Sequence, residues 1–213
     1  MSTDRLLTVV TAGLSQPSST RLLADRLATA TTDELQLAGL PVRVEVVELR
    51  DHAHAIVDAM LTGFASGDLA EAVQHVEQAD GLVAVTPVFT ASYSGLFKSF
   101  ADILDPAALT GVPVLLGATG GTERHTLALE YALRPLLAYL HADVVPTSVF
   151  AATADWAGGP ADGARGDGST GALAQRIARA GRELATAMGR REPRGEQPDP
   201  FADAPSFSDL LGR

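Results

Sequence analysis

The chain has 213 residues and a formal net charge of −10, with 26 acidic against 16 basic side chains. This balance disfavours binding to nucleic acid or to an anionic membrane surface. The absence of cysteine excludes disulfides, thiolate metal sites and a cysteine nucleophile.

No apolar run approaches the roughly 18 residues that a membrane span needs. The N-terminus has neither the basic region nor the cleavage site of a signal peptide. We therefore expect a cytoplasmic protein that does not enter a membrane.

Short apolar runs alternate with segments of helical periodicity along the chain. The pattern predicts strands at 6–11, 42–49, 81–86, 112–118 and 143–150, and helices at 18–37, 68–78, from 95, 123–141 and 170–188. The segment 50–67 reads as irregular. Alternation of strands and helices is typical of a parallel sheet covered on both faces, so the sequence predicts one α/β domain.

Two segments read as flexible. Residues 157–171 are rich in glycine and predict a mobile loop. Residues 190–213 hold four of the 12 prolines among mixed charges, so we assign 1–189 to the domain and 190–213 to a flexible C-terminal tail. The apolar residues of the tail either pack on a neighbouring subunit or partner or remain disordered; they are Phe201, Phe207, Leu210 and Leu211.

Ligands of such folds bind at the carboxyl ends of the strands, and the first loop there is rich in hydroxyls. Ser15, Ser18, Ser19 and Thr20 lie at the N-terminal end of the first predicted helix, where free backbone amides and the helix dipole favour a phosphate. One alternative is that a serine only caps the helix. Another is a serine-hydrolase elbow at Ser15, which would need glycine where Pro17 stands.

Two further loops follow the third and fourth strands. After Pro87, which is expected to end its strand, the backbone to Phe89 offers an edge for a planar ring. Gly120 and Gly121 permit close approach of a flat ligand, and Thr122 is placed to cap the following helix. Taken singly, each loop reads equally well as an ordinary turn before a helix.

The runs QADGLVAVTPVFTASYSGLFKSFADIL (78–104) and ATGGTERHTLALEYALRPLLAYL (118–140) resemble the NAD(P)H-dependent FMN reductase family. The similarity is greatest to the flavin reductases of two-component monooxygenases, such as the alkanesulfonate and luciferase-like systems. It implies a flavodoxin-like three-layer sandwich with a five-stranded parallel sheet of order 2-1-3-4-5. It also implies FMN and NAD(P)H as cofactors.

The resemblance assigns FMN-binding roles to the three loops. The phosphate would lie on Ser15, Ser18, Ser19 and Thr20, and the flavin ring against Thr86, Pro87, Val88 and Phe89 on one side and Thr119, Gly120, Gly121 and Thr122 on the other. The chain departs from the family in having Phe89 where tyrosine is frequent. It also lacks an arginine before the serines, which leaves Arg21 as the nearby cation.

Two other residues carry expectations. Lys98, the one lysine, either makes an ion pair or steers NADPH, or is simply a solvated helix position. Pro135 removes a helical hydrogen bond to Tyr131, so we predict a kink or a π-bulge there. The resemblance places this bulge at a tetramer interface, and the apolar helix predicts a homodimer or homotetramer.

We therefore expect an NAD(P)H:FMN oxidoreductase that supplies reduced flavin to a partner monooxygenase. Hydride transfer between stacked rings needs no general base, so no acid–base catalyst is predicted. No metal site is predicted either, since His52 and His54 lack further ligands at fixed spacing. The alternatives are a quinone or azo reductase that retains its FMN, and a non-catalytic electron carrier of the flavodoxin type.

Overall fold

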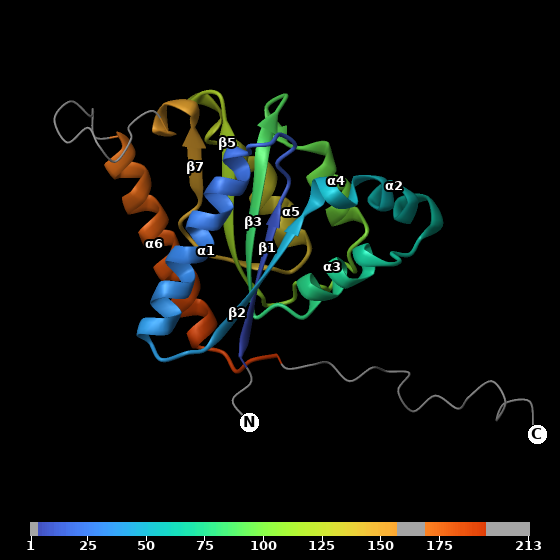
Figure 1. Cartoon of the computed structure of the whole chain (residues 1–213), viewed down its shortest axis with the longest axis horizontal. Helices are drawn as coiled ribbons and strands as arrows, with labels where there is room; N and C mark the ends of the chain where they lie inside the picture. The colour runs from blue at the N-terminus through green and yellow to red at the C-terminus, as the bar shows by residue number, and fades with distance from the viewer. Residues whose placement is uncertain (1–3, 157–168, 195–213) are drawn as a thin grey trace, which may run out of the picture.

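The centre of the protein is a twisted, mainly parallel sheet (Figure 1). The computed structural model describes residues 4–156 and 169–194. The strands are β1 (Arg5–Thr11), β2 (Val42–Glu48), β3 (Gly81–Phe89), β4 (Ser92–Tyr93), β5 (Pro113–Gly120), β6 (Asp143–Val144) and β7 (Val149–Ala152). The main path runs β2-β1-β3-β5-β6, with β4 antiparallel to β3 and β7 parallel to β5. The predicted order 2-1-3-4-5 is confirmed, because β5 is the fourth predicted strand and β6 and β7 share the fifth position.

The fifth predicted strand is broken into two pieces. β6 pairs with Pro113 and Val114, and β7 pairs with β5 from Gly117 onward. Between them stands Pro146, which has no N–H for a ladder. The next amide, Thr147 N, donates instead to Glu183 Oε2 at 2.8 Å. The break therefore follows from the proline and from a carboxylate of the last helix.

The helices are α1 (Ser19–Leu37), α2 (Ala53–Thr62), α3 (Asp68–Glu77), α4 (Gly95–Asp102), α5 (Arg134–Tyr139) and α6 (Ser169–Gly189). Short 3₁₀ turns occupy η1 (Leu49–His52), η2 (Glu123–His125) and η4 (Thr153–Trp156), and η3 (Leu129–Leu133) is a π-helix. The segment 50–67 is thus largely helical, where the sequence predicted irregular structure. Its helical periodicity is weak because Val57 and Met60 are exposed along with the polar residues.

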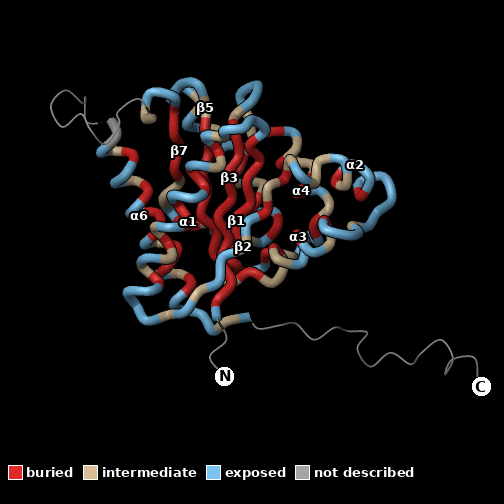
Figure 2. Tube along the Cα trace, in the orientation of Figure 1, coloured by how far each residue is buried: buried red, intermediate tan, exposed pale blue. Residues whose placement is uncertain are grey.

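Two layers of helices cover the sheet, as predicted (Figure 1). α1 and α6 pack on one face, over a cluster that includes Leu27 and Leu184. The remaining helices cover the other face, over a cluster that includes Phe100 and Leu133. Figure 2 shows the buried strands between these layers and the exposed loops at their ends. None of the described helices is long and apolar enough to cross a membrane.

The domain reaches further along the chain than the predicted boundary at 190. Arg191 pairs with Asp143, and the backbone N–H of Arg194 donates to Asp80 Oδ1 at 2.6 Å. Residues 190–194 therefore lie against the domain. The rest of the predicted tail and most of the predicted loop 157–171 lie outside the described residues.

Candidate active site

A cavity of about 500 Å³ opens at the carboxyl ends of the central strands. Its lining comes from the ends of β3 and β5 and from the loops that follow β1, β5 and β7. The lining residues are Leu14, Ser15, Ser19, Thr20, Pro87, Val88, Phe89, Thr119, Gly120, Gly121, Thr153 and Trp156. Nine of the twelve residues assigned to FMN from the sequence are among them, and Ser18, Thr86 and Thr122 are not.

The four hydroxyls of the first loop have different contacts in the structure. Ser18 is the N-cap of α1, and its side chain accepts a hydrogen bond from Arg21 N at 3.1 Å. The buried Thr20 hydroxyl lies 2.8 Å from the Thr119 hydroxyl. Ser15 and Ser19 are exposed and line the cavity. Capping and phosphate binding are therefore compatible, since different serines serve each purpose.

The cations beside this loop are already paired. Arg21 binds both Asp25 and Glu48, and the hydrogen bond with Asp25 raises the pKa of the Arg21 guanidinium. Arg50, which the sequence did not single out, lies 3.3 Å from both Glu48 and Asp51. A phosphate in this loop would thus meet mainly hydroxyls and the amides at the start of α1.

Strand β3 does not end at Pro87, as predicted, but continues to Phe89. The backbone of Val85 faces β1, since its carbonyl accepts from Ala12 N at 3.0 Å. Pro87, two residues later, faces the same way, beyond the last β1 pairing at Thr11. Its missing N–H therefore breaks no ladder bond.

Thr86 closes the second loop. Its buried hydroxyl accepts from Ser94 N and donates to the Pro87 carbonyl, both at 3.0 Å. Ser94 in turn caps α4. Thr86 therefore holds the two ends of the loop together, and Pro87, Val88 and Phe89 form the cavity wall.

The tip of this loop is a two-residue hairpin turn between β3 and β4. Thr90 and Ala91 both have positive φ, of 49° and 66°. Such a turn is usually built from Asn or Gly, because a Cβ is unfavourable at positive φ. Phe89, at the base of the turn, is 47% exposed beside the cavity.

The third loop carries the close-approach glycines. A Cβ at Gly120 would lie 2.9 Å from Phe150 Cζ, whereas a Cβ at Gly121 would meet no atom within 4 Å. Thr122 caps η2 by accepting from Arg124 N at 3.1 Å, as the sequence predicted. Gly121 therefore leaves open space beside the cavity, and Gly120 permits packing against β7.

The predicted helix 123–141 is interrupted, which confirms the predicted π-bulge. Arg134 N–H donates to Leu129 O, a bond across five residues, and Pro135 stands in the first turn of α5. Tyr131, in the middle of the π-helix, is 79% exposed. The helix, which the sequence predicted to be apolar on most sides, thus has one buried side and one exposed side.

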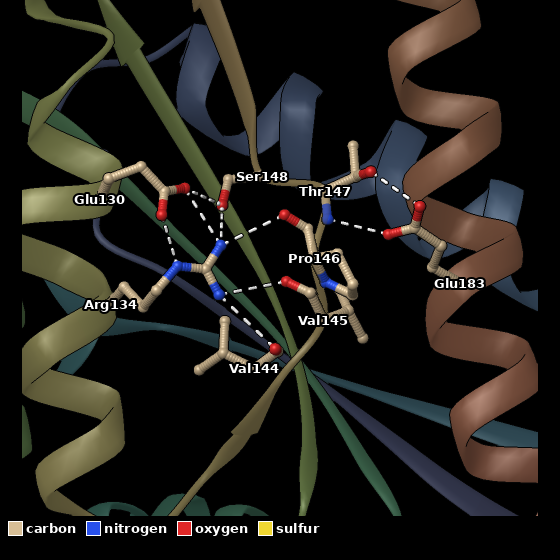
Figure 3. A network of polar contacts seen from close by, with 8 residues as sticks. All are labelled: Glu130, Arg134, Val144, Val145, Pro146, Thr147, Ser148 and Glu183. Atoms are coloured by element: carbon tan, nitrogen blue, oxygen red, sulfur yellow. Dashed lines mark hydrogen bonds and ion pairs between the residues drawn. The ribbon is translucent and has the colours of Figure 1, made fainter.

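A polar network ties this π-helix to the β6–β7 connection (Figure 3). The Arg134 guanidinium binds the Glu130 carboxylate, the carbonyl of Val145 at 3.2 Å and the Ser148 hydroxyl at 2.8 Å. Its hydrogen bond lowers the pKa of Glu130, and Ser148 lowers that pKa further. The network holds the edge of the sheet against the bulged helix.

Lys98 is part of a surface ion pair. Its Nζ lies 2.6 and 2.7 Å from the two carboxylate oxygens of Asp102, one helical turn away on α4. The side chain is 43% exposed and does not line the cavity. Lys98 therefore makes an ion pair and at the same time occupies a solvated helix position.

Three lining residues were missed by the sequence reasoning, namely Leu14, Thr153 and Trp156. The last two follow β7, whose end at Ala152 lies beyond the predicted strand end at 150. An aromatic residue shortly after the last strand of a parallel sheet was the signal that could have found Trp156.

The chemistry of the lining fits FMN. Hydroxyls and a helix N-terminus suit a phosphate, and Gly121 leaves the space that a flat ring needs. Pro87, Val88 and Phe89 supply an apolar wall.

Comparison with known proteins identifies the family of the chain. Residues 6–157 match the family of NADPH-dependent FMN reductases. The chain is 37% identical to the NADH-dependent FMN reductase SfnF of Pseudomonas fluorescens over 158 residues, 74% of this chain and 81% of that protein. It is 36% identical to an FMN reductase (NADPH) of Pseudomonas aeruginosa, over 73% and 81% of the two chains. An oxidoreductase structure from Corynebacterium diphtheriae superposes with a TM-score of 0.81 at 46% identity, covering 88% and 98%. The chain belongs to the NADPH-dependent FMN reductase family.

Proposed function

We propose that the protein transfers hydride from NAD(P)H to FMN in the cavity described above and releases the reduced flavin to a partner monooxygenase. The observation that carries this proposal is the convergence of the hydroxyl loop, the Pro87–Phe89 wall and the Thr119–Gly121 backbone on one cavity. Ser15 and Ser19, with the first amides of α1, would hold the phosphate. The other two loops would hold the ring.

FMN, when bound, supplies the hydride acceptor. The chain's own task is to position two flat rings and to exclude water from between them. Reacting atoms need to approach to roughly 3–3.5 Å for such a transfer. Backbone at Gly121 and the apolar side chains of Val88 and Phe89 suit that task, and it requires no proton donor or acceptor from the protein.

Release of the flavin is supported by how the cavity would hold the phosphate. Arg21 and Arg50 are engaged by carboxylates, so neutral donors would carry the phosphate. Hydrogen bonds from charged groups are stronger than those from neutral ones, so this arrangement favours exchange over permanent retention. The resemblance to two-component flavin reductases supports a monooxygenase as the recipient.

Steady-state kinetics test release directly. The purified protein is assayed with NADH or NADPH while free FMN is varied, with no quinone present. A rate that saturates with added FMN supports the proposal, and a rate independent of added FMN would show a retained cofactor. The relatives above include one NADH-dependent and one NADPH-dependent protein, so both nucleotides are tested.

We further propose that the π-helix lies at a contact between copies of the chain. Leu127, Tyr131 and Tyr139 are 62%, 79% and 71% exposed on one outer segment. Exposed aromatic and aliphatic groups gathered in this way favour burial in an interface. Light scattering of the wild type and of Tyr131→Ser should show a larger assembly for the wild type; a wild-type monomer would contradict the proposal.

A further inference from the structure

Trp156 is the one tryptophan of the chain and lies at the cavity. It ends the 3₁₀ turn η4, directly after β7, and is half-buried. Phe89, on the β3 side, is the other aromatic residue of the lining. The loop after β7 thus adds an aromatic side chain to a cavity that already has an apolar wall at Pro87–Phe89.

The position of Trp156 is fixed from two directions. The guanidinium carbon of Arg26, on α1, lies 5.0 Å from the centroid of the tryptophan ring. Asp155 Oδ2 accepts from Ala152 N at 2.7 Å, and Asp155 Oδ1 pairs with Arg176 at 3.4 Å. Asp155 thus holds the turn that carries Trp156, and Arg26 contacts the ring itself, so the ring loses little conformational entropy when a ligand binds against it.

Arg26 makes no ion pair with an acidic side chain within residues 4–156 and 169–194. It differs in this respect from Arg21, which lies between two carboxylates. A cation over an indole is held by the quadrupole of the ring, an interaction that strengthens as water is removed. Arg26 therefore lies against the Trp156 ring and is placed to orient it.

We propose that Trp156 is a further FMN-contacting residue and that Arg26 is the positioning residue that holds it. The inference rests on the proposed function, since it takes the cavity as the FMN site. The loop after β7 then completes a four-sided site, in which an aromatic wall from η4 contacts the bound flavin nucleotide.

The single tryptophan allows a direct test. In a protein labelled with ¹⁵N, the indole N–H of Trp156 gives one resonance, which is followed by NMR during titration with FMN. We expect that resonance to shift with FMN and not with inorganic phosphate. An unmoved resonance under saturating FMN, or one that moves only with NADH or NADPH, would overturn the inference.

The FMN affinity of Trp156 variants provides a second test of the inference. Equilibrium dialysis should show that Trp156→Ala raises the dissociation constant for FMN about tenfold, the expected size for loss of one aromatic stacking contact. Trp156→Phe should stay within about threefold of the wild type, because a smaller flat ring remains. If the wild type binds FMN and Trp156→Ala binds it with the same dissociation constant, the inference is wrong and the proposed function is unaffected. If the wild type does not bind FMN, the proposed function falls.

Arg26 is tested by its effect on the indole. In the absence of ligand, Arg26→Gln should shift and broaden the Trp156 resonance and weaken FMN binding, and Arg26→Lys should restore both because it keeps the cation. Arg43→Gln is the matched control, since Arg43 is an exposed arginine on the edge strand β2. An Arg26→Gln spectrum identical to that of the wild type would contradict the positioning role.

Discussion

The hydroxyls of Thr20 and Thr119 lie 2.8 Å apart and join the first turn of α1 to the end of β5. Thr20 and Thr119 are only 3% and 4% exposed, so the hydrogen bond between the two hydroxyls replaces hydrogen bonds to water. Two of the three loops that the sequence assigns to FMN are therefore connected by a single buried contact.

Removing both of these hydroxyls should cost less than the sum of the costs of removing each one alone. Thr119→Val leaves the Thr20 hydroxyl buried without its partner, at a cost of about 1–3 kcal/mol in the free energy of unfolding. The double variant Thr20→Val/Thr119→Val should lose less than the sum of the single variants, with a coupling of about 1 kcal/mol. Urea denaturation of the FMN-free proteins measures the cycle, and strictly additive losses would show that the contact is not formed.

Neighbouring serines of the first loop should have different roles. Ser18→Ala removes the cap of α1 and should lower the free energy of unfolding by about 1 kcal/mol. Ser19→Ala should leave stability within about 0.5 kcal/mol and weaken FMN binding roughly tenfold, because a hydroxyl that faces the cavity is lost. Denaturation and equilibrium dialysis on both proteins check this, and the reverse assignment of effects would contradict the site.

Alanine substitutions at the two glycines of the third loop should have different effects, one on FMN affinity and the other on the free energy of unfolding. A Cβ at Gly121 meets open space, so Gly121→Ala should fold normally and weaken FMN binding about tenfold by occupying the space of the ring. Gly120→Ala places its methyl 2.9 Å from Phe150 and should lower the free energy of unfolding by about 1–3 kcal/mol. Unchanged FMN affinity in Gly121→Ala would place the flavin elsewhere.

The Glu130–Arg134 network should make stability depend on pH. The hydrogen bond from Arg134 lowers the pKa of Glu130 in the folded protein. A carboxyl with a depressed pKa stabilises the fold above its unfolded pKa, about 4.3, and that contribution disappears as the pH falls through the folded pKa. The unfolding free energy of the wild type should therefore fall more steeply with acid than that of Glu130→Gln. Urea denaturation between about pH 3 and 6 measures both slopes. Glu71→Gln, at an exposed position of α3, serves as control, and equal slopes for wild type and Glu130→Gln would contradict the network.

Much of the fold follows from the sequence because the buried strands are continuous apolar runs. The strand order came from the resemblance, and the pairing of β2, β1, β3 and β5 confirms it. The helix α2 was missed because Val57, Met60 and Leu61 are exposed, which removes the contrast between its two faces. The effect of Pro135 could be predicted because it acts locally, through a hydrogen bond that it cannot donate.

The location of the candidate site could be predicted from the sequence, but the roles of its individual residues could not. Four hydroxyls within six residues look equivalent in a sequence. Their roles depend on where α1 begins, which makes Ser18 the cap and places Ser19 at the cavity. Thr86 was grouped with the ring contacts although its hydroxyl binds Ser94 N, eight residues away. Trp156 lies at the cavity because β7 extends to Ala152 and η4 follows it directly, which the sequence did not predict.

The central claim is that NAD(P)H reduces FMN in this cavity. The most direct measurement mixes the protein with NADH or NADPH and micromolar FMN under anaerobic conditions, and follows the loss of oxidised-flavin absorbance. We predict complete bleaching by at least one nucleotide at a rate that saturates with FMN, and a much slower rate for Gly121→Ala at subsaturating FMN. A protein that leaves FMN oxidised with both nucleotides would contradict the account.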